Sequence, residues 1–81
     1  MATKKEELEK ALRGEGCLGK AADDEPVFIL RAQDKLAAAI VREWAERLYA
    51  AAPFGTRNEK IDEARRLADA MDRWRTRKLP D

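Results

Sequence analysis

The chain contains no histidine, no serine and a single cysteine among its 81 residues. One cysteine cannot form a disulfide within the chain, and without histidine there is no zinc site of the usual Cys/His type. The same absences remove histidine general bases and serine nucleophiles, on which much enzyme chemistry depends. The composition therefore favours a protein that is not an enzyme, and it indicates neither a cofactor nor a metal.

An excess of one charge and long apolar runs are also lacking. The 17 basic and 16 acidic side chains nearly cancel, which favours neither nucleic acid nor an anionic membrane as the partner. The longest apolar runs, residues 27–30 and 37–41, are far shorter than the roughly 20 residues that span a bilayer, and no apolar secretory core follows the first residues. We expect a cytoplasmic protein, and the unpaired Cys17 agrees with a reducing compartment.

Large apolar side chains are scarce. Hydrophobic residues make up 44% of the chain, but 15 of them are alanine. A chain of this length buries only about 60–65% of the surface that its unfolded form exposes. We therefore expect one helical domain over residues 1–81 that is completed by homo-oligomerisation, in the simplest case as a dimer with twofold symmetry.

The N-terminal third begins with a helix signal and continues into a glycine-rich stretch. Thr3 and Glu6 form a capping box ahead of a short apolar stripe, which predicts a helix over residues 4–13. The glycines that follow predict a loop over residues 14–24.

The remaining two thirds carry two longer helix signals. Pro26 suits the first turn of a helix, and no glycine or proline follows it until residue 53, so the apolar spacing predicts a long helix over residues 25–52. Its exposed side offers two ion pairs at helical spacing, Arg42 with Glu46 and Glu43 with Arg47. A second capping box predicts another helix over residues 56–75. Because the connection is short, we expect an antiparallel helical hairpin in an all-α fold.

The first part of the long helix has an alternative interpretation. Residues 27–30 also have the composition of a short buried strand, and a single strand would need a partner from another chain. Asp34 could in addition cap a fresh helix that starts at Lys35. The sequence leaves open whether the long helix is continuous.

Gln33 is the polar residue that is hardest to explain on this helix. It falls near the middle of the apolar arc, between Ile29 and Leu36, where an unpaired amide costs roughly 1–3 kcal/mol. Its hydrogen-bond partner could be its counterpart in a second chain, a backbone group of a loop, or a ligand. We favour a buried amide that fixes the packing register. With Arg31 and Asp34 beside it, Gln33 is a candidate for binding a ligand or a partner.

Residues 14–20 match the phosphate-binding pattern G-x-x-x-x-G-K until Ala21, which replaces the hydroxyl residue that holds magnesium. No strand precedes the pattern, so we do not expect a phosphate-binding loop. Lys20 remains a candidate anion contact and joins the set of ligand-binding candidates.

The C-terminal segment concentrates cations around one aromatic ring. We expect Trp74 to pack in the core on the stripe of the last helix, and residues 76–81 to form a tail. The cations complement the helix C-terminus and also form a candidate basic surface, although we do not expect nucleic acid as the partner: Arg73, Arg75, Arg77 and Lys78.

Residues 16–37, with the string Asp-Glu-Pro-Val-Phe-Ile-Leu-Arg-Ala-Gln-Asp-Lys-Leu-Ala, resemble a family of small proteins of uncharacterised activity from bacteria and their phages or prophages. Val41-Arg-Glu-Trp-Ala and Ala68-Asp-Ala-Met71 extend the resemblance over most of the chain. The family often has a proline soon after the matched string, where this chain has Ala38. The resemblance implies an origin in a phage or a bacterial host and carries no activity that can be transferred.

Small phage proteins of this size commonly bind and block a host protein or sequester a small molecule. Our leading hypothesis is a non-enzymatic interaction protein of phage type that binds and occupies a host or phage protein. The alternative is a small oligomer that sequesters an anionic metabolite, such as a nucleotide signal, through Lys20, Arg31, Gln33 and Asp34.

Overall fold

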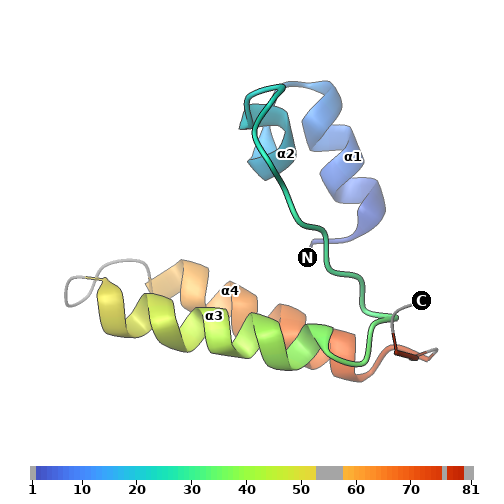
Figure 1. The fold of residues 1–81 in the computed structure, drawn as a ribbon, viewed down its shortest axis with the longest axis vertical. Coiled ribbons are helices and arrows are strands. Elements are labelled where there is room, and N and C mark those ends of the chain that lie inside the picture. The colour runs from blue at the N-terminus through green and yellow to red at the C-terminus, as the bar shows by residue number, and fades with distance from the viewer. Residues whose placement is uncertain (1, 53–57, 76, 80–81) are drawn as a thin grey trace.

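The computed structural model of the chain describes residues 2–52, 58–75 and 77–79. These residues contain no strand and form four helices: α1 (Lys4–Leu12), α2 (Gly16–Lys20), α3 (Ala37–Ala51) and α4 (Asn58–Asp72). Figure 1 shows two parts, an N-terminal arm made of α1 and α2 and a pair made of α3 and α4. A connector, residues 21–36, joins them. The all-α class that the sequence predicts is confirmed for the described residues.

Helix α1 begins where its capping signal places it. The Thr3 hydroxyl accepts a hydrogen bond from the backbone N–H of Glu6 at 3.2 Å, which satisfies one of the free donors of the first turn. The predicted helix over residues 4–13 is thus confirmed, one residue shorter than expected. Gly14 follows with a positive φ of 70°, a conformation that glycine adopts without steric cost.

The prediction of a continuous loop over residues 14–24 is wrong, because it contains the short helix α2. Gly16, at φ 72°, turns the chain back, and α2 packs against α1. A Cβ atom on Gly19 would lie 2.8 Å from the backbone carbon of Gly14 and 3.2 Å from the Cα of Ala11. These glycines therefore serve a tight turn and a close helix contact.

The prediction of one long helix over residues 25–52 is also wrong. Residues 25–36 lie outside any helix, and α3 starts at Ala37. The Asp34 carboxylate accepts a hydrogen bond from the N–H of Leu36 at 2.8 Å, and its carbonyl accepts one from the N–H of Ala37 at 3.1 Å. The alternative of a helix that starts afresh after Asp34 is thus closer to the structure, although α3 starts at Ala37 and not at Lys35, and no helix precedes it in the connector. Aromatic and β-branched residues at 27–29 are poorer helix formers than the alanines at 37–39.

Helices α3 and α4 lie side by side and run in opposite directions (Figure 1). Five of the seven buried hydrophobic residues in the described chain are alanines, and side chains this small let two helix backbones approach closely. Among the described residues no large side chain is fully buried. The core has two small clusters, one of Ala37, Ala38, Ala68 and Met71, the other of Ala45, Ile61 and Ala64.

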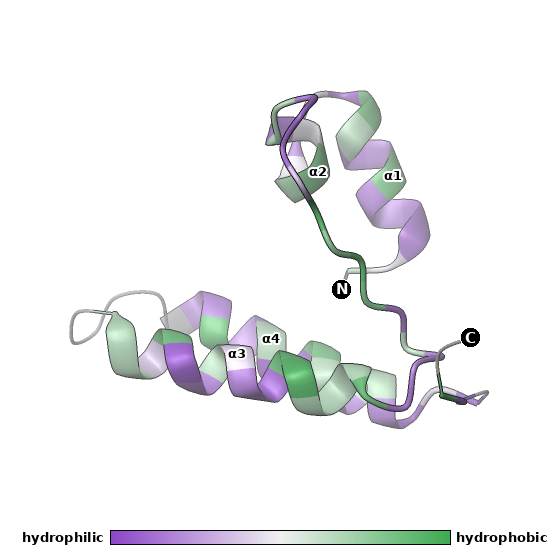
Figure 2. Ribbon diagram, viewed as in Figure 1, coloured by the Kyte–Doolittle hydropathy of each residue, from purple (hydrophilic) through white to green (hydrophobic). Residues whose placement is uncertain are grey.

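The two parts of the chain are loosely joined. In the described chain, the arm helices contact each other and make no helix contact with α3 or α4. The radius of gyration is 13.7 Å, whereas a compact domain of this length has about 12 Å. Figure 2 shows green, hydrophobic positions along the connector as well as on α3, so apolar side chains are not confined to the core.

Candidate protein-binding cleft

A cleft of about 450 Å³ lies between the start of the arm and the α3–α4 pair. The arm forms one wall, and one face each of α3 and α4 forms the other. Its lining combines apolar and charged side chains: Ala2, Glu7, Trp44, Lys60, Glu63, Ala64, Arg66 and Leu67. A cleft of this size holds a few side chains of a bound protein segment.

The floor of the cleft is apolar. Trp44 on α3 is 48% exposed although its ring is among the largest apolar groups of the chain. On α4, Ala64 is buried and Leu67 is half-buried on the next turn, and both line the cleft with Trp44. Tryptophan is enriched among the anchors that dominate binding at protein interfaces, and here it is exposed in a cleft that apolar side chains also line.

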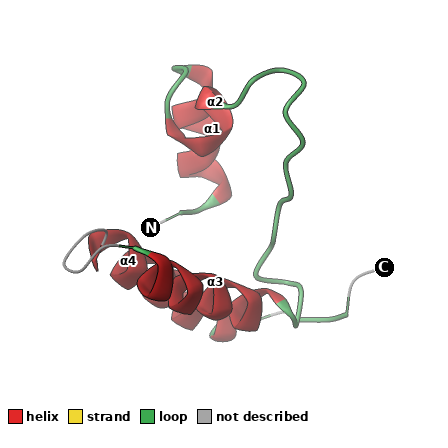
Figure 3. Ribbon diagram, turned by 60° about the vertical axis from the view of Figure 1, so that its left-hand side comes forward, coloured by secondary structure: helices red, strands yellow, loops and turns green. Residues whose placement is uncertain are grey.

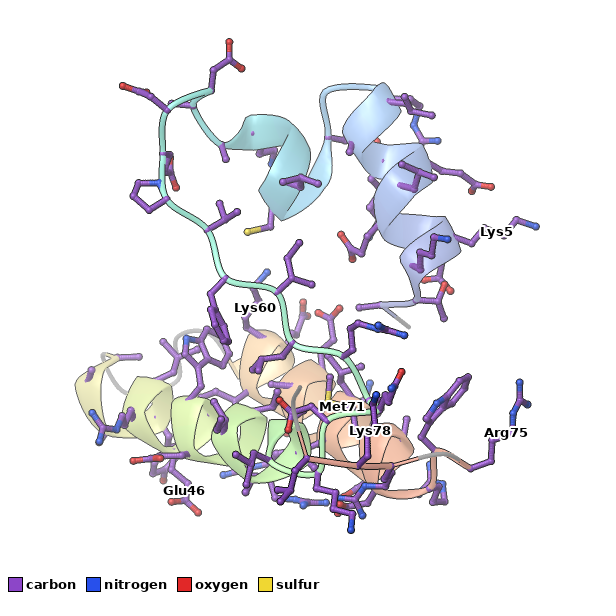
Figure 4. The ribbon with its side chains drawn as sticks, turned by 45° about the vertical axis from the view of Figure 1, so that its right-hand side comes forward. Lys5, Glu46, Lys60, Met71, Arg75 and Lys78 are labelled. Atoms are coloured by element: carbon purple, nitrogen blue, oxygen red, sulfur yellow. The ribbon has the colours of Figure 1, made fainter. Side chains whose placement is uncertain are left out.

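The rim of the cleft is charged with both signs. Lys60 and Arg66 carry positive charge, and Glu63 and Glu7 carry negative charge. Figure 4 shows Lys60 on the side of the α3–α4 pair that faces the arm, whereas Glu46 points away from it. A mixed polar rim around an apolar floor suits a protein segment better than a small anion, because no single charge dominates.

Sequence reasoning missed this cleft. On α4 the signal was present, since Lys60, Glu63, Ala64 and Leu67 recur at the spacing of one helix face. On α3 it was hidden, because Trp44 belongs to the same apolar arc as the core residues. The contact between α3 and α4 is narrow and rich in alanine, so Trp44 lies outside the core.

The structure brings together three of the four residues predicted to bind a ligand. Arg31 donates a hydrogen bond through Nη2 to the side-chain oxygen of Gln33 at 2.8 Å, and Asp34 follows at the turn that precedes α3. Lys20 is not among them: it lies on α2, and α1 is the one described helix that α2 contacts. The helix-based position of Gln33 in an apolar arc is wrong, because its segment is not helical and the residue is only half-buried.

Two of the four predicted basic residues join the same region from the C-terminal tail. The backbone N–H of Lys78 donates to the carbonyl of Gln33 at 2.7 Å, and the Lys78 carbonyl accepts from the N–H of Lys35 at 2.9 Å. Asp34 and Lys78 thus form a single parallel β-bridge. Arg77 donates through Nη2 to the carbonyl of Lys35 at 3.1 Å. Residues around the predicted binding site thus hold the C-terminal tail against the start of α3 by hydrogen bonds.

Arg42 connects the two long helices beside this region. Its Nη2 lies 2.8 Å from Asp69 and 2.6 Å from Asp72, so the predicted pairing with Glu46 gives way to partners on α4. The hydrogen bond to Asp69, then that to Asp72, raises the pKa of the Arg42 guanidinium. On the arginine side, the stabilising effect of the pairing is complete below the ordinary arginine pKa and is lost as the pH rises through the raised one. Arg77 adds a contact of 3.5 Å to Asp72.

The other two basic residues lie beyond the end of α4. That helix ends at Asp72, short of the predicted residue 75, so Trp74 does not pack in the core and is 46% exposed. The Arg75 guanidinium lies 4.9 Å from the centre of the Trp74 ring, a cation–π contact. Arg73 is exposed, and Figure 4 shows Arg75 pointing away from the helices.

Cys17 is a free, exposed thiol. In the described residues no group of three His, Cys, Asp or Glu side chains is arranged to hold a metal ion. None of the described helices has the length and the apolar character needed to cross a membrane.

Comparison of the chain with protein-family models, with curated proteins and with solved structures finds no match. The resemblance to small phage and prophage proteins therefore stays a prediction.

Proposed function

We propose that the protein is a non-enzymatic interaction protein of phage type that binds and occupies a host or phage protein. Its action would be in the cytoplasm of a bacterial host, where a single exposed thiol such as Cys17 stays reduced. The mechanism is occupancy: the bound surface of the partner is no longer available to other molecules.

The observation that carries this proposal is the large exposed surface of the chain. Its accessible area is 6859 Å², about 1,900 Å² more than the roughly 4,900 Å² expected for a folded monomer of 9.2 kDa. A standard protein interface removes about 800 Å² from each partner. The excess is large enough for more than one such interface, so we infer both a partner protein and a second copy of the chain that completes the helical hairpin as a homodimer.

The cleft supports the choice of a protein as the partner. Trp44 provides an aromatic anchor. The rim provides positive and negative charges that can contact the polar backbone and side chains of a partner protein. The same residues give little to a nucleic acid, since Lys60 and Arg66 are offset by Glu63 and Glu7.

A photo-cross-linking amino acid in place of Leu67, in the chain produced inside a bacterial host, tests the proposal. We expect one cross-linked protein, which is then purified for binding measurements. Trp44→Ala should weaken its binding by about 30-fold, the loss typical of an interface anchor. Tyr49→Ala is the matched control, because Tyr49 is an exposed aromatic on α3 that does not line the cleft. Equal affinity of the Trp44→Ala and Tyr49→Ala variants would contradict the proposal.

The alternative, a binder of an anionic metabolite, has less support. Gln33 and Asp34 already have hydrogen-bond partners, and Lys20 lies on the arm. A thermal-shift screen with nucleotides separates the two functions, because a ligand at 100 times its Kd adds about 2.7 kcal/mol of stability.

A further inference from the structure

One stretch of the connector, residues 25–31, is extended and bounded by a turn at each end. The N–H of Glu25 donates to the carbonyl of Ala22 at 3.0 Å, which closes the first turn, and the N–H of Asp34 donates to the carbonyl of Arg31 at 2.9 Å, which closes the second. Figure 3 shows the connector as an elongated, non-helical segment that leads from α2 to α3. The stretch has seven residues, a common length for a β-strand.

This stretch has the chemical features of an unpaired strand. Within the described structure, none of the backbone N–H groups of residues 27–32 donates a hydrogen bond. Val27, Phe28 and Ile29 are 54%, 85% and 72% exposed, and β-branched and aromatic residues favour strands. An exposed apolar strand with free backbone donors is a template for pairing with another strand.

The sequence of the stretch is complementary to itself in the antiparallel direction. In an antiparallel pair of strands, hydrogen-bonded and non-hydrogen-bonded residue pairs alternate. A twofold axis relates each pair to one of the same kind, so it cannot lie between two neighbouring pairs. The axis must therefore pass through one pair, in which a residue faces its own copy. The middle residue of 25–31 is Phe28, which is also the most exposed of the large apolar side chains that the structure describes. With Phe28 on the axis, the whole stretch pairs and Glu25 faces Arg31 of the second copy, twice by symmetry.

Pro26 fits this register. Proline has no N–H, so its pair must be of the non-hydrogen-bonded kind. Pro26 then faces Leu30, and Phe28, two residues further, faces itself in a pair of the same kind. Val27 and Ile29 exchange N–H to carbonyl hydrogen bonds with each other across the two chains. The N–H of Arg31 donates to the carbonyl of Glu25, whose own N–H already closes the first turn, so the ladder ends there.

We propose that residues 25–31 pair with the same residues of a second copy as an antiparallel two-stranded ribbon with Phe28 on the twofold axis. The ribbon identifies the interface of the homodimer and so rests on that part of the proposed function. It is independent of the cleft around Trp44, because none of its residues lines the cleft.

Exchange of the paired charges tests the ribbon without disturbing the helices. In E25R both ends of the stretch are basic, and in R31E both are acidic, so each variant alone places like charges opposite each other. We expect the wild-type chain to sediment as a dimer at micromolar concentration and each variant to dimerise at least about tenfold more weakly, with two unfavourable contacts per dimer. An equimolar mixture restores opposite charges at both contacts and should sediment as a heterodimer.

Helical circular dichroism confirms that the variants fold, and Asp23→Lys is a charge control outside the stretch. A monomeric wild-type chain, or a mixture no more associated than its components, would overturn the ribbon. If the chain does not form the ribbon but still binds its partner through Trp44, the ribbon is wrong and the proposed partner binding stands. If the ribbon forms but partner binding does not depend on Trp44, the proposed partner binding is wrong and the ribbon stands.

Cysteine scanning tests the register. In a Cys17→Ala background, Phe28→Cys places the two sulfurs in facing, non-hydrogen-bonded positions, where Cβ atoms come close enough for a disulfide. Ile29→Cys faces Val27 of the other copy and is the matched control. With diamide as oxidant we expect a linked dimer for Phe28→Cys at a rate at least about tenfold higher than for Ile29→Cys. Equal rates would exclude Phe28 from the axis.

Discussion

Gly19→Ala should destabilise the arm, although alanine is the better helix former. In the interior of a helix alanine is favoured over glycine by about 1 kcal/mol. Here the added Cβ would lie 2.8 Å from the backbone carbon of Gly14 and 3.2 Å from the Cα of Ala11. Backbone atoms cannot rotate away, and overpacking of this kind costs about 1–3 kcal/mol. The clash therefore offsets or outweighs the propensity, with a net loss of up to about 2 kcal/mol, which lowers the folded-to-unfolded ratio of the arm by up to about 30-fold.

Because the arm helices make no helix contact with α3 or α4, the loss should be local. Amide hydrogen exchange should accelerate in α1 and α2 and stay unchanged in α3 and α4. Lys20→Ala is the matched control, since Lys20 is an exposed residue of the same helix. Protection of the arm in Gly19→Ala equal to that in Lys20→Ala would refute the close contact between α1 and α2.

Three further changes probe the α3–α4 pair and the thiol. Ala68→Leu inserts a large side chain where the exposed fraction is 0% and should lower the free energy of unfolding by about 1–3 kcal/mol, whereas Ala39→Leu on an exposed position of α3 should change it by less than about 0.5 kcal/mol in urea titrations. Arg42→Met should lower Tm at low ionic strength, and the decrease in Tm should be smaller at about 1 M NaCl. The decrease should be the same at any pH between about 6 and 10, because the pKa of Arg42 is raised. Cys17→Ala should leave fold and partner binding intact, since the thiol is exposed and free; lost binding with unchanged circular dichroism would show that Cys17 is functional.

The sequence predicted best those elements whose signals are local. The start of α1 depends on a single contact between Thr3 and Glu6, three residues apart. The pair of Glu43 and Arg47, one turn apart on α3, forms as expected, with Arg47 Nη2 2.8 Å from the glutamate oxygen. Interactions of this range are encoded in the spacing of the residues.

The connector was harder to predict because two periodicities overlap in it. Ile29 and Leu36 fit a helical arc, while the run at residues 27–30 fits a strand equally well. The contact that decides between them is distant in sequence. The backbone N–H of Lys78 donates to the carbonyl of Gln33, and the carbonyl of Lys78 accepts from the N–H of Lys35. Neither the helical wheel nor the local propensities contain a contact over more than forty residues.

The prediction of a ligand site at Gln33 followed from the same assumption that residues 25–52 form one helix. On a helix, Gln33 needs an unusual partner, and that need suggested a ligand. In the observed turn its side chain accepts from Arg31, and the unusual demand disappears. The cleft, in contrast, depends on how deeply two alanine-rich faces approach each other, a property of the packed pair that the spacing of the residues does not fix.

The break at Asp34 changes what the apolar residues before it can do. On a continuous helix Ile29 and Leu30 would extend the arc that α3 presents to α4, and the chain would bury them itself. In the extended connector Leu30 and Ala32 reach the core, where both pack against the cluster that contains Ala38 and Met71. Side chains two residues apart share a face of a strand, so the face that carries Leu30 also carries Phe28. A ribbon anchored at Leu30 would hold its symmetric Phe28 pair on the side of the α3–α4 helices, and the surface that the chain leaves exposed would then be covered by its own copy.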